Sequence, residues 1–461
     1  MVSFGSNQKE NNQTKTKTQI LGKIISELEN LQSPNIRIRA LEKLKEVIEE
    51  LKSKINNGTL DEKTLVDKLK EKFGNFDERR IKTLIGKIIG FVTGQNSAQD
   101  LVNEINSGIV VLQAALALKE NEQTKNSQTQ IQTVASFAYI EYLLKNTSAA
   151  HVSFAAVIDG FFKAQTFQDF NGKLSLNNND VAKRIFDALS YAFATKEERK
   201  EPKFNGIRTN IENWKKENAV SLEFLDNYFK FILVTISASN EAARPFRRAA
   251  AEEAKKDGTQ KLATELHQSL VYLKREGYLS DDEYVRATQE IANITGFYSL
   301  GAQFLAQEGF YKEARELLLL GEYVNKLDQS FLNVKELIDE LIDEINKLVD
   351  AKTEEEKKKR EEIIEAVTNE INGAGELAKM IVAEMKKLNF EEDEGEEFRR
   401  KIEEELKEII KKLDERIKEV EEKTNELKDG SIKGKLNLAI EKALENIENI
   451  RKEHIGDRRL V

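Results

Sequence analysis

Residues 133–162 read TVASFAYIEYLLKNTSAAHVSFAAVIDGFF and form the most apolar and aromatic part of the chain. Polar residues interrupt this stretch once, at KNTS, and Ser148 is suited to cap a second helix because its hydroxyl can accept from a free backbone N–H. We therefore predict two buried helices, the second over 149–163. Glu141 and Asp159 keep each apolar run short of the roughly 20 residues that cross a membrane. The rest of the chain is expected to pack on this core.

The composition favours long helices throughout. Only 3 prolines occur in 461 residues, and no window alternates apolar and polar residues as a half-buried strand does. The expected fold class is all-α, with a multi-helix globular core and a C-terminal region of long helices that resembles a bundle or coiled coil. The chain has no cysteine, which excludes disulfides and thiolate metal sites. With no apolar leader at the N-terminus, we expect a cytoplasmic, intracellular protein.

Charge and aromatic content divide the chain. Residues 333–461 hold 27 basic and 37 acidic residues but only two of the 34 aromatic ones, Phe390 and Phe398. This shift predicts an acidic C-terminal helical bundle over 333–461. Residues 120–130 contain no apolar side chain and are expected to be a linker or long loop. The other predicted parts are a disordered tail over 1–18, an N-terminal helical module over 19–125 and a central aromatic-rich helical domain over 131–332.

The acidic third contains a helical stripe. Its apolar residues are spaced three or four positions apart: Phe398, Ile402, Leu406, Ile409, Leu413, Ile417 and Val420. This spacing is close to a heptad seam, which predicts a face covered by neighbouring helices of the same chain or by another molecule.

Three segments share the pattern glycine, any residue, leucine, then Ser or Asp. The middle one, residues 169–175 (DFNGKLS), resembles the calcium loop of an EF-hand between two helices. Aligned on Gly172, the first ligand position is Phe167 and the twelfth is Asn178, so the two essential carboxylates are missing. We predict no metal and interpret the pattern as helix starts. Ser280 and Glu283 have the spacing of a capping box.

Residues 297–320 (FYSLGAQFLAQEGFYKEARELLLL) resemble a tetratricopeptide unit, with Gly301 and Phe304 in the first helix and Tyr311 and Ala314 in the second. No second copy follows at the expected 34-residue period. We interpret the segment as an antiparallel helical hairpin in which Gly301 permits close approach.

Basic residues gather between 196 and 256, with aromatic residues among them, a combination that suits phosphate contact and base stacking. Ten carboxylates share this window with the thirteen basic residues, which is also typical of a solvated surface of mixed charge. The candidate nucleic-acid-binding residues are Lys200, Lys203, Arg208, Trp214, Arg244, Arg247 and Arg248.

No catalytic motif is recognisable: the chain has no Walker loop, no G-x-S-x-G elbow and no H-E-x-x-H pair. His151 is interpreted as a structural histidine, and His267 is not expected to form a ligand pair with Glu265, which lies on a different helix face. No catalytic residue, metal or cofactor is predicted. The leading hypothesis is a non-enzymatic interaction or assembly protein, a scaffold that binds a protein partner or forms homo-oligomers. The alternatives are a nucleoprotein or coat-like protein that grips RNA or DNA with the basic cluster, and a helical toxin or translocator that inserts residues 109–118 or 154–162. No membrane partner is expected under the leading hypothesis.

Overall fold

The computed structural model describes residues 16–322 apart from 124–126, 148–151 and 218–220, together with 351–366 and single positions between 324 and 445. Within these residues all regular structure is helical and no strand occurs, which confirms the all-α fold class. The chain forms two compact units, Met1–Leu317 and Leu318–Val461. The predicted heptad stripe at 398–420 lies outside the described residues.

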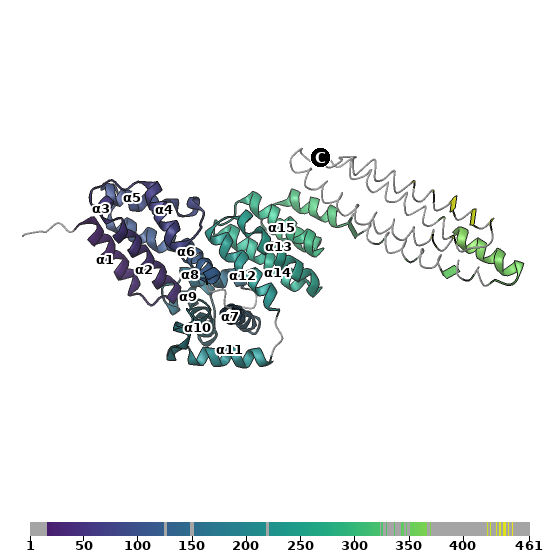
Figure 1. Ribbon diagram of the computed structural model, residues 1–461, viewed down its shortest axis with the longest axis horizontal. Helices are drawn as coiled ribbons and strands as arrows, with labels where there is room; N and C mark the ends of the chain where they lie inside the picture. Colours follow the sequence, from purple (N-terminus) through teal and green to yellow (C-terminus); the bar gives the residue numbers. More distant parts are fainter. Residues whose placement is uncertain are drawn as a thin grey trace, which may run out of the picture. The chain divides into compact units, whose positions relative to one another are not determined.

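The first unit begins with a layer of amphipathic helices (Figure 1). The predicted tail, 1–18, overlaps this first helix by two residues, since the helix begins at Lys17 with Thr16 as its N-cap. Leucine, isoleucine and valine recur on one face of each helix and are buried there. The elements are α1 (Lys17–Glu29), α2 (Asn35–Glu50), α3 (Lys52–Asn56), α4 (Glu62–Phe73), η1 (Glu78–Ile81) and α5 (Lys82–Thr93).

The helix α6 (Ala98–Gln123) lies at the centre of the first unit. Residues 108–117 are buried on every side, because α1, α2, α4 and α5 pack on part of the helix and α8 and α12 on the rest. Among the described residues α6 alone is long and apolar enough to cross a bilayer, and 67% of that apolar window is buried inside the protein. This is the pattern of a core helix.

The aromatic stretch supplies α7 (Ser127–Lys145) and α8 (Phe154–Lys163), so its two predicted helices exist. The second begins later than predicted. Its N-cap is Ser153, whose hydroxyl accepts from the backbone N–H of Ala156 at 3.3 Å, whereas Ser148 lies outside the described residues. The predicted core residues of this helix, Phe154, Val157, Ile158 and Phe161, are at most 2% exposed.

Two predictions about where helices begin and end are wrong. Residues 120–123 are the last turn of α6 and residues 127–130 the first turn of α7, so the expected linker is helical at both of its ends. The interpretation of residues 169–175 as a helix start is also wrong, since α9 (Phe167–Leu174) runs through Gly172 and Ser175 is its C-cap. Beyond it lie α10 (Asn179–Ala192), η2 (Glu198–Lys200), η3 (Pro202–Phe204) and α11 (Asn205–Glu217).

The last helices of the unit pack beside one another (Figure 1). They are α12 (Leu222–Ser237), α13 (Asn240–Asp257), α14 (Gln260–Arg275), α15 (Asp281–Thr295), α16 (Tyr298–Gln307) and the first turns of a helix that begins at residue 311, up to the end of the unit at Leu317. The predicted capping box of Ser280 and Glu283 is present at the start of α15. The predicted close approach at Gly301 is confirmed: a Cβ there would lie 2.8 Å from the Cβ of Ala292 and 2.9 Å from Cδ2 of Leu317.

The contact pattern does not separate residues 19–125 from the aromatic-rich part. Helix α12 packs on α6 as well as on α7, and α8 packs on α6, so both predicted regions up to Leu317 lie in one compact unit. Within the aromatic-rich part, Phe137 of α7 stacks on Phe229 of α12 at 4.3 Å between ring centroids.

Candidate functional site

A cavity of about 190 Å³ lies where α6, α7, α12 and the segment after α10 meet. Its apolar wall includes Phe193 and Phe229, and its polar wall includes threonine hydroxyls and charged groups. We take it as the candidate site because it combines hollow space with polar side chains from several helices. The lining residues used below are Glu120, Thr129, Thr133, Thr195, Lys196 and Arg199.

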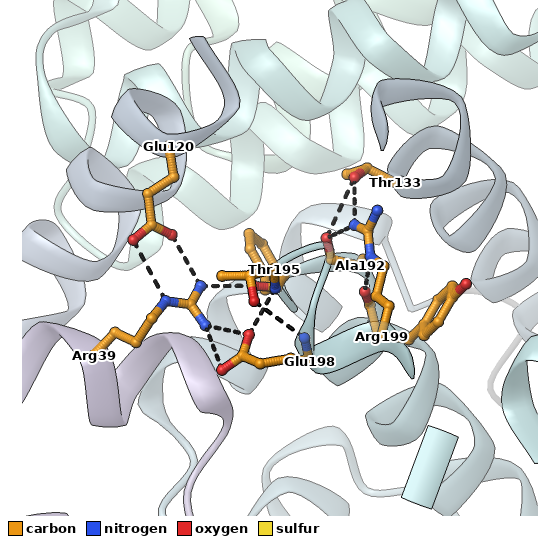
Figure 2. Close-up of polar contacts among 9 residues, drawn as sticks. Arg39, Glu120, Thr133, Ala192, Thr195, Glu198 and Arg199 are labelled. Atoms are coloured by element: carbon orange, nitrogen blue, oxygen red, sulfur yellow. Dashed lines mark hydrogen bonds and ion pairs between the residues drawn. The ribbon is translucent and has the colours of Figure 1, made fainter. Parts of the chain in front are cut away.

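Arg39 of α2 contacts two residues that line the cavity, Glu120 and Phe193, as Figure 2 shows for Glu120. Its guanidinium lies 2.9 Å from the carboxylate of Glu120 on α6 and 3.0 Å from that of Glu198 on η2. It also donates to the backbone carbonyl of Phe193 at 2.7 Å, just beyond the end of α10. One side chain therefore ties together three segments that are more than 70 residues apart in sequence.

Arg199 forms the opposite side and caps the C-terminus of α10 (Figure 2). Its guanidinium donates to the carbonyl oxygens of Tyr191 at 2.9 Å and Ala192 at 2.6 Å, at the partly negative C-terminal end of the helix. It also donates to the hydroxyl of Thr133 at 2.7 Å and to the carbonyl of Thr129 at 3.2 Å. Burial lowers the pKa of Arg199.

The polar groups around the cavity therefore hold helix ends in place. The hydroxyl of Thr195 accepts from the backbone N–H of Glu198, and the Glu198 carboxylate accepts from the N–H of Thr195. Lys196 is exposed at the rim. Within the described part of the chain, no group of three or more His, Asp or Glu residues is placed to hold a metal ion. The arrangement can receive a small group or a partner's side chain, but it pairs no nucleophile with a base.

The first four residues of the predicted basic cluster lie on η2, η3 and α11, beside the cavity. Lys200 pairs with Glu197 at 2.8 Å and Lys203 with Glu201 at 2.7 Å. Arg208 donates to the backbone carbonyl of Arg199 at 3.2 Å. Trp214 is only 6% exposed and packs against Tyr139 and Tyr142. Trp214 therefore presents little surface to a nucleic-acid base, whereas Lys200 and Lys203 are exposed.

The other three lie on α13 and converge on one carboxylate of α15. Arg244 donates to Glu290 at 2.8 Å and the buried Arg247 at 2.6 Å, while Arg248, more than half exposed, lies 3.7 Å away. The guanidinium groups hold the pKa of Glu290 below its usual value although burial opposes them. Figure 1 shows α13 and α11 in different parts of the unit, so the structure brings the predicted cluster together as two groups.

Sequence reasoning missed a buried polar cluster around Asp159 of α8. Its fully buried carboxylate accepts from the hydroxyls of Tyr272 at 2.7 Å and Tyr278 at 3.2 Å and pairs with Lys163 at 2.9 Å. Burial raises the pKa of Asp159, and both burial and the Asp159 charge raise that of Tyr278. Nothing in the local sequence marks this cluster, since the two tyrosines lie more than 110 residues from the aspartate.

His267 of α14 is fully buried, while His151 lies outside the described residues. Its ring stacks on Phe304, and neither ring nitrogen has a hydrogen-bond partner. Burial lowers the pKa of His267 to about 3, so the ring is neutral in the folded protein at physiological pH.

Comparison with known protein families, with curated proteins and with solved structures finds no match for this chain.

Proposed function

We propose that this chain is a non-enzymatic helical interaction or assembly protein that binds a protein partner or copies of itself, within the cell. The observation that carries the proposal is the engagement of the basic cluster by the protein's own carboxylates. Four of its cationic side chains lie within 3 Å of a carboxylate oxygen, namely those of Lys200, Lys203, Arg244 and Arg247. A nucleic acid would have to break these pairs to use the cations, whereas a partner protein can use the helical surfaces as they stand.

Nucleic-acid binding is the second candidate, and one observation favours it. Three arginines share Glu290, and Arg244 also lies 3.9 Å from Glu241, so positive charge exceeds negative charge at this edge of α13. Arg248 is the most exposed of the three and would be the first to meet a phosphate backbone.

A third candidate, insertion into membranes, would use residues 109–118 of α6 or 154–162 of α8. Both segments are buried among other helices, so insertion would first require the unit to open. The free energy needed for such opening is close to that of unfolding, because these segments are the centre of the core.

One set of measurements on the full chain separates the three functions. Light scattering after size exclusion, with absorbance at 260 and 280 nm, should show a protein oligomer or a complex with a protein, free of nucleic acid. Binding to RNA or DNA that weakens steeply with salt and is lost in Arg248→Glu would instead favour the second candidate. Leakage of dye from liposomes would favour the third. A monomer that binds no partner protein would contradict the proposal.

A further inference from the structure

A buried positive charge near the start of α2 lacks a counter-ion. The side chain of Arg37 is fully buried, and its Nη2 donates to Oδ1 of Asn106 on α6 at 2.6 Å. Its Nε and Nη1 have no hydrogen-bond partner among the described residues. A guanidinium in this state is costly to bury, because it loses hydration without gaining a partner.

Further unpaired donors lie at the same end of the helix. Pro34 is the N-cap of α2 and has no side chain that could accept from the first turn. The amide Nδ2 of Asn35, the first residue of the helix, is buried without a partner. Helical side chains lean toward the N-terminus, so Arg37, two residues further on, is directed at this end of α2. Free N–H groups and the helix dipole there favour a negative charge.

Arg39, two residues along the same helix, shows what a satisfied guanidinium looks like in this protein. It is held by two carboxylates and a carbonyl, as described above. Arg37 has one neutral amide oxygen in place of all three. Gln113, two turns beyond Asn106 on the same face of α6, is also buried with both amide atoms unpaired. Arg37 therefore has donors that remain without an acceptor, while those of Arg39 are paired.

The charge of Asp169 on α9 acts on Arg37 and partly opposes the effect of burial on the Arg37 pKa. Burial lowers the pKa of Arg37 to about 10, and the Asp169 charge acts in the other direction. Asp169 is already engaged: it accepts from the backbone N–H of Gln165 at 2.9 Å and pairs with Lys173 at 2.9 Å. The turn before α2 is close to this segment, since the Ser33 hydroxyl donates to the carbonyl of Gln165 at 3.4 Å.

We propose that the N-terminus of α2, with Arg37 and Asn35, binds a small oxyanion of the size of inorganic phosphate. The anion accepts from Arg37 Nε and Nη1 and from the Asn35 amide, and it supplies the counter-charge that the fold omits. Because the Arg37 side chain is fully buried, a free ion should reach it more readily than a phosphoryl group attached to a larger molecule. The proposal is independent of the interaction function proposed above.

Thermal unfolding of the full chain tests this site with inorganic phosphate, added at constant ionic strength against chloride. Phosphate should raise the melting temperature along a saturating curve, since a ligand at 100 times its Kd shifts the unfolding equilibrium about 100-fold. Exclusion of phosphate from the protein surface also stabilises, but that effect does not saturate at millimolar concentration. Glucose 6-phosphate should give no saturating rise; a rise with it alone would overturn the assignment to a free ion.

Variants identify the residues. Arg37→Met should lose the saturating response, and the exposed Arg286→Met on α15 should keep it. In case Arg37→Met does not fold, Asn35→Asp places a carboxylate among the same donors and should fold well, melt higher without phosphate and ignore added phosphate. The proposal would be overturned if phosphate gave no saturating rise in the melting temperature of the wild type. It would also be overturned if Asn35→Asp kept that rise. A large loss of stability in Asp169→Asn together with a silent wild type would show that Asp169 is the true counter-ion.

Discussion

The imidazole of His267 lies against the phenyl ring of Phe304, with the ring centroids 5.2 Å apart and the planes at 22°. The contact joins α14 to α16, and Gly301 of α16 faces the edge of the imidazole. No charged group contributes to the lowered pKa of His267, which results from burial alone. Protonation of this ring would place an unpaired charge in the core.

The fold should therefore lose stability in acid through His267. Its pKa is about 3 in the folded protein and 6.5 in the unfolded chain, so its contribution is fully present above pH 6.5. As the pH falls from 6.5 toward 3, the unfolded state takes up the proton first and stability falls by up to about 1.4 kcal/mol per pH unit. Urea denaturation at pH 7, 6 and 5 measures this slope.

The His267→Leu variant provides the control for this slope, because buried carboxyl groups with raised pKa values, such as Asp159, act in the opposite direction in both proteins. The difference in unfolding free energy between wild type and variant should change with pH by the amount expected for one histidine. The same pH dependence in both proteins would mean that His267 is hydrated or paired.

Substitution of Gly301 by alanine should destabilise the hairpin of α16 and residues 311–317. The added Cβ would lie under 3 Å from side-chain carbons of Ala292 and Leu317, so the helices must move apart at a cost of about 1–3 kcal/mol. Gly86→Ala is the matched control, since nothing lies within 4 Å of a Cβ at this helical glycine of α5. It should stabilise by about 0.5–1 kcal/mol through helix propensity. Equal effects of the two substitutions in chemical denaturation would contradict the close approach.

Truncation of Phe161 to alanine should cost about 3–5 kcal/mol, because the ring is fully buried and stacks on Phe193 at 5.5 Å. Urea unfolding measures the loss. Tyr142→Ala offers a comparison, since that ring is 41% exposed and should lose less. A loss below about 1 kcal/mol for Phe161→Ala would show that this part of the core is misplaced.

Removal of the Arg39 guanidinium should loosen the junction of α2, α6 and the end of α10. Arg39→Met keeps most of the aliphatic stem but loses hydrogen bonds to Glu120, Glu198 and the Phe193 carbonyl, at a cost of about 1.5–3 kcal/mol. A double-mutant cycle with Glu198→Gln measures the coupling. Additive losses in the cycle would mean that the pair is not formed in solution.

Local sequence determined the helices and several of their ends. The all-α class follows from periodicity, few prolines and no alternating windows, all of which act over a few residues. The capping box of Ser280 and Glu283 was predictable because a cap is a contact between residues three apart. The burial of Phe161 and its neighbours follows from the apolar composition of their own stretch.

Tertiary contacts decided what the local sequence left open or predicted wrongly. The polar end of α6 continues as a helix through Glu120, which pairs with Arg39, a residue 81 positions earlier. Arg247 belongs to a charged stretch typical of a surface, yet it is buried because Glu290, 43 positions later, supplies its partner. The free energies of such charged groups depend on partners distant in the chain, so no local pattern predicts them. The same reason explains the difference between Arg37 and Arg39, which are two residues apart in sequence. Tertiary packing places two carboxylates beside Arg39 and leaves two nitrogens of Arg37 without a partner among the described residues.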